Sequence, residues 1–140
     1  MILSNAQQPY LDLAKKLKVS GGTIHVRMNK LTNAGIIKGS TLVLDPKKLG
    51  FDVSAYIGIN LHNARDYDKV LLRLEEISFI LEAHYTTGQY NIFTKIAVKS
   101  VSELHKFLLR VQAIKEIQST QTIMILDTPI NRQLAPQMEE

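Results

Sequence analysis

The chain has 140 residues, of which 45% are hydrophobic and 21% charged, a composition that suits one folded domain or two small ones and excludes a disordered protein. It contains no cysteine, which excludes disulfides and thiolate metal sites, and charges interrupt every apolar run well before the ~18 residues of a membrane span. The start lacks the basic and apolar segments of a signal peptide. We therefore expect a cytoplasmic protein with no membrane partner.

Positive charge is concentrated in the first third of the chain. Residues 1–50 contain eight lysines and arginines against two aspartates, a net charge of +6. Residues 51–140 contain nine lysines and arginines against eleven acidic residues, a net charge of −2. A basic region of this kind binds a polyanion or forms a solvated surface, and charge alone leaves both open.

Two short helices are predicted first. Pro9 suits the first turn of a helix, and the apolar residues after it recur with the spacing of one helix face: Tyr10, Leu13, Ala14 and Leu17. Ser20 is expected to cap a second helix by accepting a hydrogen bond from a backbone N–H of its first turn. Gly35 is expected to end that helix in a left-handed conformation. Its buried face is expected to consist of Ile24, Met28 and Leu31.

The segment from Ile36 to Leu44 contains a Gly39-Ser40 turn and alternating leucines, which predicts a short two-stranded wing. The proline, two lysines and glycine that follow, in residues 45–50, predict a linker. We therefore expect residues 1–45 to form a winged helix-turn-helix domain, residues 46–50 a linker, residues 51–126 a second domain and residues 127–140 a polar tail.

The second domain alternates strands with helices. A period of two over residues 55–61 predicts a strand, and Asp66 opens a helical period. Two strands are predicted at residues 80–86 and 92–98. Ser100 and Glu103 form a capping box before a second helix, and residues 117–126 predict a last strand. The β-α-β-β-α-β order is typical of the ferredoxin-like α+β fold.

Two helices around a tight turn predict a helix-turn-helix whose second helix enters the DNA major groove. Thr23 and Arg27 are candidates for base contacts, and Ser20 at the helix N-terminus suits a phosphate. Given the charge, we favour double-stranded DNA over a helical pair that serves only packing. The candidate DNA-binding residues are Ser20, Gly22, Thr23, His25, Arg27 and Lys30.

The stretch LDLAKKLKVSGGTIHVRMNKLTNAGII, residues 11–37, closely resembles the helix-turn-helix of the leucine-responsive and asparagine-activated regulators, the Lrp/AsnC family. Residues 22–27 (GTIHVR), 85–90 (YTTGQY) and 116–120 (EIQST) are similar to the asparagine-activated branch. The resemblance covers nearly the whole chain. It implies a winged helix-turn-helix followed by a ferredoxin-like effector and oligomerisation domain. It also implies homodimers that associate further, often to octamers, with an amino-acid effector, here asparagine, bound between dimers.

Three departures from the family pattern stand out. Relatives begin with a longer first helix, of which little more than residues 1–5 remains here. Either the start of the sequence is misassigned or trimmed, or the protein has a reduced DNA-binding domain with a shortened first helix. Gly21 stands where proline is usual, which loosens the helix start by about 1 kcal/mol or less. Asn91 stands where many relatives have aspartate, and we expect it to influence which effector is recognised.

The resemblance places the effector near one turn and one strand. Gly88 permits a positive φ, and the backbone N–H groups of its turn can hold a carboxylate. Hydroxyl and amide groups at residues 119–121 suit an amino-acid ligand. The alternative is an ordinary hairpin turn with solvent-facing polar residues. The candidate effector-binding residues are Tyr85, Thr86, Gly88, Gln112, Ser119 and Gln121.

No catalytic site is predicted. The four histidines lack metal-ligand spacing, and the chain has no phosphate-binding loop or nucleophile motif. The sequence therefore predicts a DNA-binding transcriptional regulator, with no metal or cofactor, that responds to an amino acid. Two alternatives are a stand-alone sensor without DNA binding and an enzyme similar to the sirohaem decarboxylases, which keep the helix-turn-helix but act on a tetrapyrrole.

Overall fold

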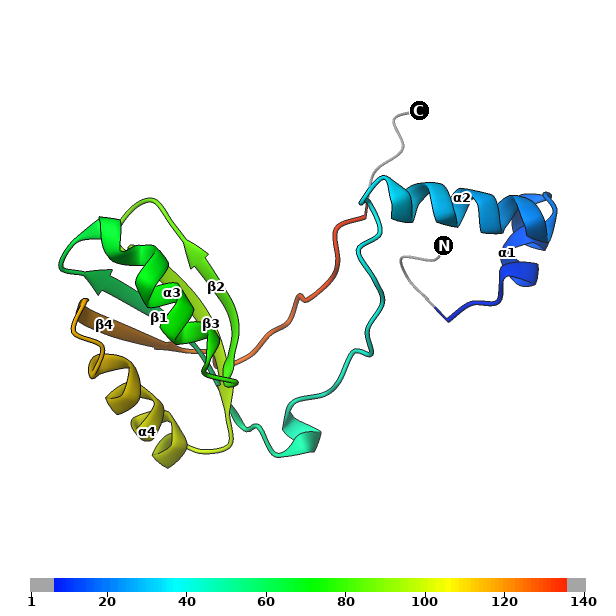
Figure 1. Cartoon of the computed structure of the whole chain (residues 1–140). Coiled ribbons are helices and arrows are strands. Elements are labelled where there is room, and N and C mark those ends of the chain that lie inside the picture. Colours follow the sequence, from blue (N-terminus) through cyan, green and yellow to red (C-terminus); the bar gives the residue numbers. More distant parts are fainter. Residues whose placement is uncertain (1–6, 136–140) are drawn as a thin grey trace. The chain divides into compact units, whose positions relative to one another are not determined.

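The computed structural model describes residues 7–135, and the predicted shortening of the first helix therefore lies outside the described residues. The chain divides into two compact units. One comprises the residues up to Val43 together with the described residues from Ile130, and the other is Leu44–Pro129 (Figure 1). No helix within residues 7–135 is long and apolar enough to cross a membrane.

The first unit is built on two helices, α1 (Tyr10–Leu17) and α2 (Gly21–Asn33). Their contact buries Leu13, Ala14 and Ile24, with Tyr10, Val19 and Met28 partly buried around them. The predicted positions of Leu17 and Leu31 on the inner faces are wrong, because their exposed fractions are 49% and 37%. Helices of eight and thirteen residues cover only one stripe of each other.

Both predicted ends of α2 are confirmed. The Ser20 hydroxyl accepts a hydrogen bond from the backbone N–H of Thr23 at 3.1 Å. Gly35 has a φ of 75°, and the N–H groups of Gly35 and Ile36 reach back to the carbonyls of Thr32 and Leu31, each at 3.0 Å. This pair of hydrogen bonds is a Schellman motif, which requires the left-handed residue that glycine supplies.

The predicted two-stranded wing is not formed. Residues 37–45 contain neither helix nor strand, and Leu42 and Val43 are 70% and 95% exposed. Alternating leucines show which side chains share a face, but a strand also needs a partner, and each arm here is only a few residues long. Within the predicted linker, Lys47–Leu49 forms a 3₁₀ turn, whose first N–H donates to Asp45 Oδ1 at 3.1 Å.

The second unit is a four-stranded antiparallel sheet with two helices on one face (Figure 1). Its strand order is β2-β3-β1-β4, with antiparallel pairing throughout, so the predicted ferredoxin-like arrangement is confirmed. The elements are β1 (Val53–Leu61), α3 (Tyr67–Glu75), β2 (Ile80–Tyr85), β3 (Ile92–Val98), α4 (Val101–Gln112) and β4 (Ile117–Met124).

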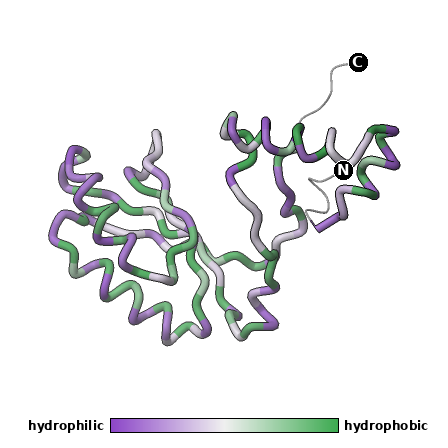
Figure 2. Tube along the Cα trace, turned by 45° about the vertical axis from the view of Figure 1, so that its right-hand side comes forward, coloured by the Kyte–Doolittle hydropathy of each residue, from purple (hydrophilic) through white to green (hydrophobic). Residues whose placement is uncertain are grey.

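The alternation of side chains gives this sheet two different faces. Ala55, Ile57 and Ile59 of β1 are fully buried beneath the helices, together with Val70 of α3 and Val111 of α4. Figure 2 shows hydrophobic and hydrophilic residues alternating along the trace of these elements. Neither α3 nor α4 covers the other face, which we call the open face. It carries Tyr56, Gly58, Asn60, Glu82, His84, Phe93, Lys95, Ala97, Ser119, Gln121 and Ile123.

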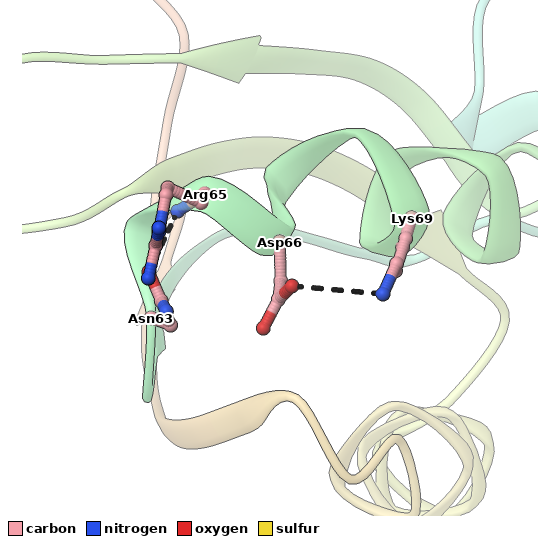
Figure 3. Close-up of polar contacts among 4 residues, drawn as sticks. All are labelled: Asn63, Arg65, Asp66 and Lys69. Atoms are coloured by element: carbon pink, nitrogen blue, oxygen red, sulfur yellow. Dashed lines mark hydrogen bonds and ion pairs between the residues drawn. The ribbon is translucent and has the colours of Figure 1, made fainter.

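A 3₁₀ turn (η2, Ala64–Asp66) leads into α3 (Figure 3). Asn63 Oδ1 accepts hydrogen bonds from the backbone N–H of Arg65 at 3.1 Å and from its Nε at 3.4 Å. Lys69 Nζ lies 3.8 Å from Asp66 Oδ1 in an exposed ion pair. The turn fixes the first residue of α3, Tyr67, whose ring stacks on Tyr85 at the end of β2 with 4.3 Å between centroids.

Candidate DNA-binding and effector sites

The start of α2 holds three of the predicted DNA-binding residues. Ser20 caps the helix, and its hydroxyl lies 2.8 Å from the hydroxyl of Thr23, so these two side chains bond to each other. Gly22 is exposed beside them. Helix geometry leaves the first backbone N–H groups of α2 without partners inside the helix, and a phosphate oxygen can accept from them.

Arg27 and Lys30 are exposed further along α2, one helical turn apart. Within residues 7–135 we find no hydrogen bond or ion pair that occupies the Arg27 guanidinium. A free guanidinium on a recognition helix can donate two hydrogen bonds to one guanine. His25 differs, because its ring packs edge-on against Tyr10 of α1 at 4.5 Å between centroids. It therefore helps to join the two helices.

The surroundings of α2 are strongly basic. Between residues 7 and 43 the chain has six lysines and arginines, and Asp12 is the only acidic residue in that range. No ion pair to these cations is found among the described residues. This unit can therefore meet a polyanion with little neutralisation from its own side chains.

The predicted effector turn between β2 and β3 is tightly held at both ends. Thr86 donates from its hydroxyl to the carbonyl of Tyr90 at 3.0 Å, and its N–H donates to the carbonyl of Asn91 at 3.0 Å. Gly88, at the tip, has the expected positive φ, 96°. A β-carbon there would meet nothing within 4 Å, so the glycine is required by the backbone and not by crowding within one chain.

The other predicted effector residues fall on both faces of the sheet. Tyr85 stacks on Tyr67 on the helix side, where Gln112 at the end of α4 also donates to the Thr120 hydroxyl at 3.1 Å. Ser119 and Gln121 belong to the open face. Ser119 Oγ accepts from Asn60 Nδ2 at 3.4 Å.

These residues do not form one pocket in a single chain. Tyr85 lies level with Ile92, Ile59 and Thr120 in the strand register, so all the candidates lie near the same end of the sheet. However, β2 and β4 are the two opposite edges of the sheet. Two strands separate them, a distance of about 14 Å at ~4.8 Å per strand step, which exceeds the reach of one amino acid held by both edges.

A cavity of about 600 Å³ lies elsewhere, between α3 and β2. Leucines and isoleucine line it with three carboxylates at Asp68, Glu75 and Glu82, and none of the predicted effector residues contributes to it. These carboxylates could pair with the ammonium group of an amino acid, but the lining contains no cationic side chain to hold its carboxylate. The cavity therefore does not replace the predicted site.

Two residues with clear structural roles at the turn are absent from the predicted set. The hydroxyl of Tyr90 donates to Gln121 Oε1, which connects the turn to β4. Asn60 holds Ser119 in the same way from β1. Gly58 is a glycine within the predicted strand β1, which indicates that another group lies close to the backbone there. No local pattern shows that this group is the ring of Tyr90.

Asn91 has a structural role at the end of β1. Its Oδ1 accepts the backbone N–H of Leu61 at 2.9 Å, beside the register shift that β1 shows against β4. Its own N–H donates to the carbonyl of Ile59 at 3.0 Å. An aspartate would accept the same hydrogen bond, so the replacement preserves this contact. Asn91 therefore holds the end of β1, and its influence on effector recognition stays a prediction.

The two units together define a class of protein. A capped helix-turn-helix in a basic unit binds DNA, and a ferredoxin-like unit with a polar turn provides a separate place for a small ligand. Within the described residues no group of histidines and acids is arranged to hold a metal. The combination is that of a ligand-responsive transcription regulator.

Comparison with known proteins gives the family. The Lrp/AsnC ligand binding domain matches residues 54–135, and a winged helix-turn-helix DNA-binding domain matches residues 1–38. Regulatory protein AsnC of Haemophilus influenzae is 45% identical over 137 residues, covering 97% of this chain and 91% of the relative. The structure of Escherichia coli AsnC superposes with a TM-score of 0.92 at 45% identity, covering 96% of this chain and 91% of that chain.

A Neisseria meningitidis transcriptional regulator in complex with L-Met aligns with a TM-score of 0.90 at 17% identity, covering 96% of this chain and 89% of that one; this likeness shows the fold alone. The chain belongs to the Lrp/AsnC family of transcription regulators. It is a DNA-binding regulator that responds to an amino acid, as the sequence predicted.

Proposed function

We propose that the protein binds operator DNA as a homodimer through α2 and that asparagine changes its affinity for the operator. The observation that carries the DNA part is the exposure of Arg27 and Lys30 on a capped helix, within a segment, residues 7–43, that has six basic residues against one acidic residue. The choice of asparagine as the effector is supported by the similarity to relatives named regulatory protein AsnC.

The DNA contacts divide by chemistry. Arg27 reads a base edge, because its guanidinium is exposed and offers a bidentate pair of donors. Lys30, Ser20 and the N–H groups near Gly22 position the helix on phosphates. Thr23 shares its hydroxyl with Ser20, so its part in base recognition is secondary. His25 supports the helix pair through Tyr10.

The effector contacts require a second copy of the chain. Because the candidates lie on the two opposite edges of the sheet, a bound amino acid can meet both sets only where the β2 edge of one subunit approaches the β4 edge of another. The turn at Gly88 then holds the carboxylate through its backbone N–H groups, and Gln121 or Ser119 meets the rest of the ligand. Binding there favours one assembly over others, which changes the spacing of the α2 helices.

The open face supports the dimer. It carries a row of half-buried aromatic rings in which Tyr56 stacks on Phe93 at 5.2 Å and Tyr90 follows at 5.9 Å. Since a layered fold buries both faces of such a sheet, the open face of a second copy is its natural cover. Edge contacts between dimers then build larger assemblies, including octamers.

We propose a binding function with no catalysis, and therefore no metal or cofactor. Its site residues are hydroxyls, amides and backbone groups that recognise a ligand without activating it. Since its partner is double-stranded DNA, the proposal places the protein in the cytoplasm.

The test is fluorescence anisotropy with duplex DNA from the region upstream of the chain's own coding sequence. We expect saturable binding that weakens steeply between 50 and 200 mM salt, about tenfold or more, because α2 and its neighbours neutralise several phosphates. A scrambled duplex of equal length is the control. Equal binding to both duplexes would contradict sequence-specific regulation.

A further inference from the structure

The ring of Tyr90 occupies the space that a side chain on Gly58 would need. A β-carbon on Gly58 would lie 2.6 Å from Cδ1 of Tyr90 and 2.7 Å from its Cε1 and Cγ, closer than real contacts allow. These atoms belong to the rigid body of the ring and not to a flexible chain end. The ring therefore lies directly against β1, and only glycine at position 58 admits it there.

Tyr90 also connects three strands through the open face. Gly58 is paired with Phe93 of β3 on one side and with Gln121 of β4 on the other. Tyr90 stacks on Phe93 with 5.9 Å between centroids and 28° between planes, and its hydroxyl donates to Gln121 Oε1. The ring thus spans β1 from the end of the turn to a predicted effector residue.

The peptide group that follows Tyr90 is fixed by two hydrogen bonds. Its carbonyl accepts the Thr86 hydroxyl at 3.0 Å, and the next N–H, of Asn91, donates to Ile59 at 3.0 Å. A displacement of the ring therefore has to be taken up by the free part of the turn, residues 87–89. That is where Gly88 presents the backbone N–H groups assigned to the effector carboxylate.

We infer that Tyr90 is the positioning residue of the effector site and that it depends on Gly58. The inference rests on the proposed function. Tyr90 sets the turn at Gly88, and by donating to Gln121 Oε1 it fixes the amide so that the two N–H donors of Gln121 remain for the ligand. Gln121 therefore selects a ligand group that accepts hydrogen bonds, such as a carboxylate or the amide oxygen of asparagine.

The test is a double-mutant cycle read by calorimetric titration with L-asparagine, with thermal unfolding measured in parallel. Tyr90→Phe keeps the ring on Gly58 and removes only the donor, and we expect asparagine to bind about tenfold more weakly. Gly58→Ala displaces the ring, and we expect a loss of at least about tenfold. In a Tyr90→Ala background, Gly58→Ala should change affinity less than about twofold, because the ring it displaces is gone.

Tyr10→Phe is the matched control, because it removes the same hydroxyl group from α1, in the other unit and outside the effector residues and the open face. This variant should therefore bind asparagine as wild type does. A purely structural role for Tyr90 would lower the unfolding temperature of Tyr90→Phe and leave its asparagine affinity within twofold of wild type.

Two results would overturn the inference if wild type binds asparagine. One is an unchanged asparagine affinity of Tyr90→Phe with a lowered unfolding temperature. The other is that the losses of affinity from Gly58→Ala and Tyr90→Ala add up in the double variant. If wild type binds no amino acid in a panel of twenty, the effector part of the proposed function fails and the inference fails with it. The two failures are therefore told apart by the wild-type titration alone.

Discussion

The two units of the chain differ greatly in how much apolar surface they bury. Among the described residues, three are fully enclosed between α1 and α2, whereas fifteen form the core beneath the helices of the sheet unit. A buried aliphatic side chain contributes about 1.5–3 kcal/mol. We therefore expect the sheet unit to be the more stable of the two.

Charge follows the same division. The unit with the small core carries the positive charge, which repels itself until a polyanion neutralises it. The unit with the large core, Leu44–Pro129, contains ten basic and ten acidic residues and carries no net charge. Binding of DNA is thus expected to stabilise the first unit, and binding of the effector to act on an already rigid second unit.

The largest effect is expected from Ile57→Ala, which removes a fully buried side chain at the centre of β1. We expect the free energy of unfolding of the sheet unit to fall by about 3–4 kcal/mol, because the surrounding layers cannot close the cavity. Urea unfolding followed by circular dichroism measures it. Leu72→Ala, at a side chain that is 66% exposed, is the control and should cost about 0.5 kcal/mol or less. A fall in the free energy of unfolding below about 1 kcal/mol for Ile57→Ala would contradict the view that the sheet unit is stabilised by its buried core.

Arg27→Ala should weaken operator binding by about 1–3 kcal/mol and relax the sequence preference at one base pair. The unfolding of the sheet unit should not change. Lys106→Ala removes an exposed cation from α4 instead and is the matched control. Anisotropy titrations compare the two variants, and equal affinities for both would remove Arg27 from the recognition surface.

Ser20→Ala removes the cap of α2 and should destabilise the helix-turn-helix by about 1 kcal/mol, whereas Ser20→Gly should cost only a few tenths. Because this unit has little other stability, we expect hydrogen exchange at the start of α2 to accelerate about fivefold in Ser20→Ala. Exchange in β1 should stay as in wild type. Acceleration in both units would show that they unfold together.

The smallest effect is expected from Lys69→Met, which breaks the 3.8 Å ion pair with Asp66 (Figure 3). The Lys69 side chain is 74% exposed, so the loss should be about 0.5 kcal/mol or less. Thermal unfolding at low and high salt measures it. A larger and salt-dependent loss would mean that surface charge, and not burial, stabilises the start of α3.

Local signals in the sequence predicted the fold well. The period-two strands, the capping box and Gly35 each act within a few residues, and the structure confirms them: Ser100 Oγ accepts the N–H of Glu103 at 3.1 Å. The Glu103 carboxylate reaches the N–H of Lys99, one residue before the expected one. The prediction of the two-stranded wing was wrong, because a strand also depends on a pairing partner and local alternation does not show whether one is present.

The candidate sites were less predictable. Exposure of Arg27 follows from helical spacing, so the recognition surface could be expected from the sequence. The division of the effector residues between two sheet edges depends on strand order, and the contact of Tyr90 with Gly58 joins residues 32 positions apart. Neither follows from any local pattern.

The most direct test of the regulator proposal is the operator affinity of the full chain with and without asparagine. Anisotropy titrations on the upstream duplex, at fixed salt and with 5 mM asparagine or none, give the two dissociation constants. We expect them to differ by about fivefold or more, the usual size of a coupling between two sites, and glutamine at the same concentration to have a smaller effect. Equal constants with and without asparagine, in a chain that still binds the duplex specifically, would contradict the account.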